Sequence, residues 1–157
     1  MNHLSSALLA LALIAPMAAC SEPTDDFRSL ESWENGMMVD SDAGAFRVTL
    51  SSADGMLGMG RNDLIVRVGF HDFNDPTDEG RGIPGAELEV EAWMPEADAS
   101  MQSVIEIGYL GDGAYSVDNV VLTEEGVWNL DIEISVGDGM HESVSLAFDI
   151  DELDIRN

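Results

Sequence analysis

Lysine is absent from this chain of 157 residues, and six arginines stand against 31 aspartates and glutamates. The formal net charge of −25 excludes the basic surface with which proteins bind nucleic acids. The same charge argues against docking on anionic lipid and predicts a surface that attracts cations and repels other copies of the chain. We therefore expect a monomer that binds no nucleic acid. Adaptation to a saline habitat explains the acidity equally well.

Cysteine is nearly absent as well. Cys20 is the only one in the chain, which excludes a disulfide framework and a cysteine metal centre. It directly follows two alanines and an apolar run from Leu4 to Ala15. This run has the length of an export signal and is shorter than the roughly 20 residues that a membrane span needs. Residues 1–19 are therefore predicted to be a cleaved signal peptide.

The junction at Cys20 resembles the lipobox of bacterial lipoproteins, in which the cysteine becomes the first mature residue and carries lipid. Met17 departs from that pattern, which most often has leucine there, and Ser21 replaces the aspartate that retains some lipoproteins in the inner membrane. The resemblance implies a lipid anchor at Cys20, because several acyl chains hold a protein stably on a membrane. We expect the outer membrane, with the domain facing the periplasm or the exterior.

Residues 20–43 are polar and acidic, and we predict that they form the lipidated N-terminus and an acidic tether. Within them Phe27, Leu30 and Trp33 recur at every third position. Two interpretations remain open. A short helix ending at Gly36 docks on the domain, or the stretch is a disordered spacer.

From residue 44 onward the apolar residues recur at every second position, which is typical of strands with one buried and one solvated face. Glycine-containing turns such as GDG at 111–113 and 137–139 separate the strands. We predict one all-β domain over residues 44–157, an immunoglobulin-like antiparallel β-sandwich of about seven strands. The expected strands lie in AFRVTL, DLIVRVGF, ELEVEAWM, SVIEIGYL, AYSVDNVVL, VWNLDIEISV and VSLAFDI, with a bulge near Asp118-Asn119.

The alternation also places the residues around the segment EVEAWMPEADASM. Met94 falls in the apolar phase of its strand, and Met101 shares the apolar phase of Ile107 and Tyr109. Trp93 falls in the opposite phase, among glutamates. We interpret Trp93 as an exposed contact residue for another envelope protein, since isolated aromatic residues are common at interfaces. The alternative is that the tether covers it, through Phe27 or Leu30.

With these strands placed, the order of three motifs resembles the YtkA-like family. The motifs are GIPGAELEVEAWMP, GDGAYSV and EEGVWNLDIEISV, and the resemblance extends from Ala45 to Ile150. It implies an immunoglobulin-like fold and a link to copper handling, without an established reaction. The matching positions are Gly82, Pro84, Gly85, Ala86, Met94, Pro95, Gly113, Tyr115, Gly126 and Trp128.

Copper is the first cofactor hypothesis. Family members often carry a second methionine and a histidine shortly after the Met-Pro pair. Here Met101 corresponds to the second methionine, but no histidine follows, and His141 would have to approach from another hairpin. Thioether and imidazole ligands suit Cu(I). The alternative is that Met94 and Met101 are core residues, since methionine commonly fills gaps in cores.

Calcium is the second cofactor hypothesis. It takes six to eight oxygen ligands, which loops at the ends of sandwiches can supply. The loop HDFNDPTDEGRG does not follow the EF-hand spacing, and a solvated acidic loop is the alternative interpretation. Its candidate ligands are Asp72, Asn74, Asp75, Asp78 and Glu79.

Enzymatic activity has no support in the sequence, because no nucleophile motif, zinc-protease motif or nucleotide-binding loop occurs. We therefore expect a non-enzymatic accessory or binding module. Its function is copper handling, or a structural or protein-interaction role without a metal, or a sandwich stabilised by Ca²⁺.

Overall fold

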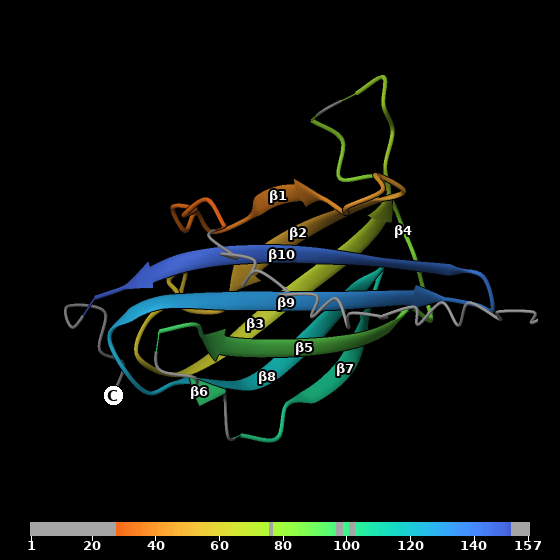
Figure 1. The fold of residues 1–157 in the computed structure, drawn as a ribbon. Helices are drawn as coiled ribbons and strands as arrows, with labels where there is room; N and C mark the ends of the chain where they lie inside the picture. The colour runs from red at the N-terminus through yellow and green to blue at the C-terminus, as the bar shows by residue number, and fades with distance from the viewer. Residues whose placement is uncertain (1–27, 76, 97–98, 101–102, 152–157) are drawn as a thin grey trace, which may run out of the picture.

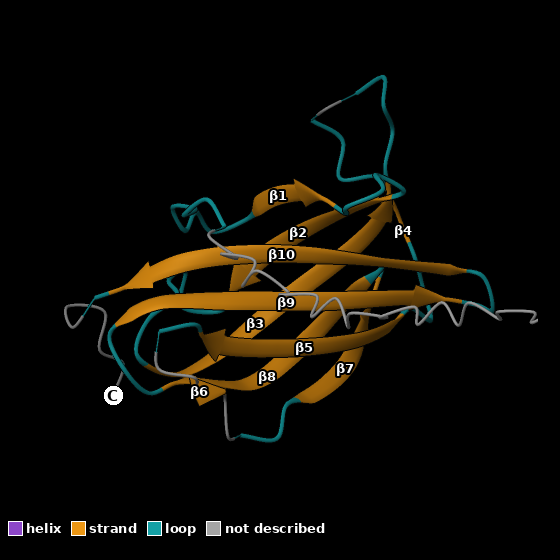
Figure 2. Cartoon of the chain, in the orientation of Figure 1, coloured by secondary structure: helices purple, strands orange, loops and turns teal. Residues whose placement is uncertain are grey.

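Ten strands and no helix occur in the computed structural model, which describes residues 28–75, 77–96, 99–100 and 103–151 (Figures 1 and 2). One sheet has the order β1-β2-β3-β8-β7 with β4 beside β3, and the other has the order β10-β9-β5-β6. Every pairing between strands is antiparallel, which confirms the predicted β-sandwich. The strands are β1 (Met37–Asp40), β2 (Phe46–Ser52), β3 (Gly60–Phe70), β4 (Arg81–Gly82), β5 (Glu87–Met94), β6 (Ala99–Ser100), β7 (Glu106–Gly111), β8 (Ala114–Leu122), β9 (Gly126–Val136) and β10 (Met140–Ile150).

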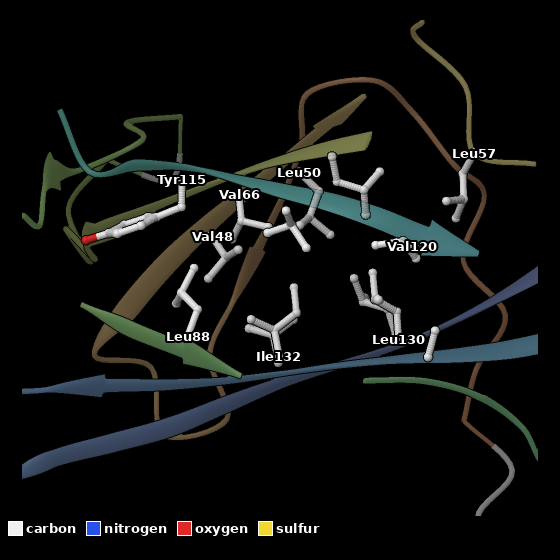
Figure 3. Close-up of a cluster of buried hydrophobic side chains, with 14 of the residues drawn as sticks. Val48, Leu50, Leu57, Val66, Leu88, Tyr115, Val120, Leu130 and Ile132 are labelled. Carbon is white, nitrogen blue, oxygen red and sulfur yellow. The ribbon is translucent and has the colours of Figure 1, made fainter. Parts of the chain in front are cut away.

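The core lies between the two sheets and follows the alternation in the sequence. In β9, Trp128, Leu130, Ile132 and Ile134 are buried, whereas Asp131 and Glu133 on the other face are not. β-Branched and aromatic residues fit such a pleated, half-buried surface. Figure 3 shows side chains of both sheets meeting in this core, among them Val48, Leu50, Val66, Leu88, Leu130 and Ile132.

A bulge interrupts the pairing of β3 with β8, as the sequence predicts. The register shifts between Asn62 and Leu64, and Asn119 adopts a positive φ of 70°. Asp63 accepts a hydrogen bond of 3.0 Å from the backbone of Asn119 and so supports the bulge. Because β8 has one extra residue here, the next buried position after Val117 is Val120, three residues later, and both lie in the core.

The sandwich begins before the predicted boundary at residue 44. Strand β1 lies within the segment expected to be a tether, and it pairs with β2. The described residues before it are neither a helix nor a detached spacer. The Trp33 ring packs edge-on against Phe148 at 5.7 Å, and the Glu31 amide donates a hydrogen bond of 2.8 Å to the carbonyl of Ala147. We call residues 28–36 the strap.

A second connection joins the two sheets next to the strap. The amide of Asp42 donates to the carbonyl of Ser143 at 2.9 Å. The carboxylate of Glu142 accepts hydrogen bonds from the Ser41 hydroxyl and, at 3.1 Å, from the Ala45 amide. These contacts and the strap cover the outer edge of β10, and we call this edge the closed side of the sandwich.

The predicted signal peptide at 1–19 and the lipid-attachment residue Cys20 lie outside the described residues. Within the described ranges, no helix is long and apolar enough to cross a membrane.

Candidate functional site

Met94 is a core residue, as its phase predicts. It is the last residue of β5 and is 5% exposed. Its methyl group lies so close to Gly126 that a Cβ placed on this glycine would stand 3.4 Å from it. The Trp128 indole, on the same β9 segment, is also buried and donates to the carbonyl of Glu124 at 2.9 Å. The methionine and the Gly-x-Trp motif therefore pack together at one end of the sandwich.

His141 lies at the opposite end of the same sheet. It pairs with Ser135 of β9, whereas Trp93, the neighbour of Met94, pairs with Asn129. Six residues of β9 separate these two positions, which corresponds to about 20 Å. The structure does not bring Met94 and His141 together, and the His141 ring lies 2.7 Å from the Ser135 hydroxyl instead. Met101, the third residue of the predicted copper set, lies outside the described residues.

The predicted calcium ligands do not converge on a common point. Asp72 accepts hydrogen bonds from the backbone and side chain of Asn74, which lower its pKa. Asp75 accepts from the Thr77 hydroxyl and amide, which lower its pKa likewise. Asp78 repeats the pattern with the amide of Gly80, at 3.0 Å.

Each of these three carboxylates thus caps its own turn. Glu79, the last predicted ligand, extends towards Arg67, with 3.6 Å between the charged atoms. The turns account for the acidic residues of the loop without an ion. Among the described residues, no group of three or more histidines and acidic residues is arranged to hold a metal.

Trp93 is half-buried rather than free. Its indole N–H donates to the Asp131 carboxylate at 2.7 Å, and the Arg28 guanidinium lies 5.7 Å from the centre of its ring. Arg28 also forms an ion pair with Asp131. Burial alone would raise the pKa of Asp131, but hydrogen bonds from Trp93, Ser145 and Arg28 outweigh it and hold the pKa below 3.8. The strap therefore covers part of Trp93 through Arg28. Of the two residues predicted to cover it, Phe27 lies outside the described residues, and Leu30 is exposed and forms a bridge to Ala147 of β10.

The outer face of the four-stranded sheet is acidic around this ion pair. Glu89 of β5 stands directly opposite Glu133 of β9, and Glu91 stands opposite Asp131. Like charges in directly opposed positions destabilise a strand pair. Arg28 offsets one of these pairs, so the face keeps a surplus of negative charge next to β5.

Several of the family motif residues build a turn around Tyr115. The Tyr115 hydroxyl accepts from the amide of Ala86 and donates to the carbonyl of Ile83, both at 2.8 Å. Burial raises the pKa of this tyrosine, so it remains a donor. A Cβ on Gly82 would stand 2.1 Å from the carbonyl oxygen of Asp112, which explains the glycine there.

One surface was missed by the sequence analysis. Ile107 and Tyr109 pair with Val117 and Tyr115, so they point to the core face of their sheet. They are nevertheless 40% and 51% exposed, whereas Val117 and Tyr115 are buried. The prediction of a covered apolar face in this strand is therefore wrong for Ile107 and Tyr109. Their alternating pattern carried no signal of this, because exposure here depends on the extent of the opposite sheet.

The comparisons with known proteins agree with this geometry. The family model described as YtkA-like matches residues 40–133, which is more than half of the chain. The chain belongs to the YtkA-like family. The matched range includes Met94 and the turn built on Tyr115, begins before the predicted Ala45 and ends before the predicted Ile150. No curated protein matches the chain.

Solved structures with the same fold come from two bacteria. A copper-bound variant of FetP from uropathogenic Escherichia coli strain F11 aligns with a TM-score of 0.51 and 14% identity, over 75% of this chain and 96% of FetP. The copper-reconstituted P19 protein of Campylobacter jejuni aligns with a TM-score of 0.50 and 12% identity, over 74% of this chain and 94% of P19. At this level of identity they show a common fold.

Proposed function

We propose that this member of the YtkA-like family is a non-enzymatic accessory protein of the bacterial cell envelope that handles copper. The observation that carries the proposal is that its sandwich is shared with two proteins studied in copper-bound form, FetP and P19. Their copper content is a property of those proteins. Here it identifies Cu(I) as the ligand to test first.

The residues that suit Cu(I) lie at one end of β5. Met94 supplies a thioether, the soft ligand that Cu(I) prefers, directly before Pro95. It is buried at the end of β5. A second soft ligand is needed, and Met101, which follows β6 in the sequence, is the candidate. The proposed set leaves out His141, because this residue pairs with Ser135 towards the other end of β9.

A Cu(I) titration of the full-length protein in detergent, against a competing chromophoric chelator, tests the proposal. Tight one-to-one binding that is lost in both Met94→Leu and Met101→Leu supports it. His141→Gln is the matched control and should bind like the wild type. Leucine replaces methionine with little change in volume and costs less than about 1.5 kcal/mol of stability, so folded variants are expected. Absence of Cu(I) binding by the wild type contradicts the proposal.

The membrane anchor is a separate part of this proposal. Lipid on Cys20 would hold the domain at the membrane surface, which we propose to be the outer membrane. Mass spectrometry of the N-terminal peptide and fractionation of cells that produce Cys20→Ser test it. Release of this variant from the membrane fraction is the expected result, and retention of the variant argues against lipidation.

A further inference from the structure

In the part of the chain that the structure describes, no strand lies opposite β7. Strand β5 lies over β8 in the other sheet, so the next position beyond β5 would lie over β7. Of the described strands, β6 alone occupies that position, and its two residues pair with Trp93 and Met94 at one end of β5 (Figure 1). We call the side formed by β7 and the remainder of the β5 edge, residues 87–91, the open side.

The open side exposes side chains that a complete sandwich would bury. Ile107 and Tyr109 face inwards from β7, and a hollow of about 420 Å³ lies between them and Leu88 of β5. A second hollow, of about 570 Å³, lies on the outer face of the four-stranded sheet, where Glu89 and Glu91 of β5 line it together with Arg28, Asp131 and Glu133. Ser103 and Ile105, which precede β7, also border this hollow. The exposed apolar residues of the first hollow are typical of a binding surface.

The edge of β5 offers hydrogen bonds as well. Residues 87–91 pair with β9 on one side, and among the described residues no strand pairs with them on the other. The N–H and C=O groups along such an edge form a template for an added strand. An extended chain is therefore the occupant that the backbone of β5 suits.

The negative charge on the outer face of β5 determines which side chains the added strand should have. Glu87, Glu89 and Glu91 project to the outer face of β5, and all three are exposed. On the β9 side Glu89 and Glu91 already meet like charges. Opposite charges in directly opposed positions stabilise a strand pair, so lysine or arginine in the added strand would be favoured on this face.

We propose that the edge of β5 at residues 87–91 binds an extended segment of a partner protein in which apolar and basic residues alternate. The apolar residues cover Ile107 and Tyr109, and the basic residues meet the three glutamates. This docking surface is independent of the copper site, since it uses neither Met94 nor Met101. A second copy of the chain does not fit, because pairing β5 with itself would oppose glutamate to glutamate, in a protein of net charge −25.

A short synthetic peptide of alternating lysine and valine is the probe, and a peptide of the same composition in scrambled order is its control. Binding to the full-length protein in detergent is measured by calorimetry, and the bound site by hydrogen exchange. We expect the alternating peptide to slow exchange of the amides at 87–91 and to bind more tightly than the scrambled peptide. The triple variant Glu87→Gln, Glu89→Gln, Glu91→Gln should bind about tenfold more weakly.

Two matched variants distinguish binding at this surface from a general electrostatic attraction between the acidic protein and a basic peptide. The first is a triple variant that removes the same charge at exposed turns and should leave binding of the alternating peptide unchanged. Its substitutions are Glu124→Gln, Glu125→Gln and Asp138→Asn. Ile107→Thr with Tyr109→Thr keeps the strand and removes the apolar cover, and should weaken binding about tenfold. The proposal would be overturned by equal losses of binding in the two charge variants or by equal binding of the two peptides. It would also be overturned by a lack of protection at 87–91 or by a dimer paired through β5 in sedimentation.

Discussion

The two lateral sides of this sandwich are built differently. On the closed side, the edge of β10 receives hydrogen bonds from the amides of Glu31 and Asp42, and Trp33 packs against Phe148. On the open side, the described residues pair with the corresponding edge of β5 at Trp93 and Met94 alone, and Ile107 and Tyr109 are half exposed. Both edges belong to the four-stranded sheet, and among the described residues the β10 edge is the better covered of the two.

Natural sheets generally cover or blunt their edges, since an exposed edge can pair with another chain. The closed side does this with residues that precede the first long strand. The open side instead carries three outward glutamates, which repel a second copy of the same chain and attract a basic one. We interpret the closed side as serving stability, and we propose that the open side binds a partner.

Substituting one aromatic residue on each side provides the largest test of this comparison. We expect Trp33→Ala to lower the free energy of unfolding by about 3 kcal/mol, because its ring packs on Phe148 and its N–H bonds to Gly55. Tyr109→Ala should cost less, about 1 kcal/mol, since half of that side chain is already exposed and its ring contact is with Tyr115 at 5.1 Å. Urea unfolding measures both. Equal losses would mean that the two sides contribute alike.

A pair of glutamates offers a second test. Glu142→Ala should cost about 2 kcal/mol, because its carboxylate accepts hydrogen bonds from Ser41 and Ala45 and thereby joins the two sheets. Glu87→Ala, on the open side, should change stability by less than about 0.5 kcal/mol. Thermal unfolding of the two variants gives the comparison. A small effect of Glu142→Ala would show that the strap alone closes its side.

Most of the fold could be predicted from the sequence, because one face of each long strand is buried. The alternation of β9 and β10 assigned their core residues correctly, and the slip at Asp118-Asn119 located the bulge. Strand β1 was missed because its four residues, MMVD, show no clear alternation and follow an acidic stretch. Periodicity within one segment cannot show that a short segment will pair with a distant strand.

The candidate site was less predictable, since it depends on which residues the topology brings together. The sequence did identify Met94 as a core residue, but the distance between Met94 and His141 follows only from the register of β9. The turns around Asp72 and Asp75 show why acidic spacing alone does not define a calcium site. Likewise, the exposure of Tyr109 is set by where the opposite sheet ends.

Acid should weaken the attachment of the strap to the sheet face. The pKa of Asp131 lies below 3.8, so this carboxylate contributes stability above that pH and loses it as the pH falls through the folded-state pKa. We expect the unfolding free energy of the wild type to fall on acidification by more than that of Asp131→Asn, which itself costs about 1 kcal/mol near neutral pH. Glu133→Gln changes the charge equally and leaves the Arg28 pair in place. If Asp131→Asn keeps the full acid dependence, other carboxylates govern it.

The smallest expected effect separates stability from binding on the open side. Glu89→Lys converts the like-charge pair with Glu133 into an opposite-charge pair, so we expect a gain of about 0.5 kcal/mol in unfolding free energy. Glu125→Lys, at an exposed turn, is the control for a general decrease in negative charge. The same Glu89→Lys variant should bind the lysine–valine peptide more weakly than the wild type, because a cation then faces a cation. A stability gain together with a binding loss would mean that the acidic edge is kept for a partner at some expense to the isolated domain. A gain of equal size in Glu125→Lys would instead assign the effect to net charge.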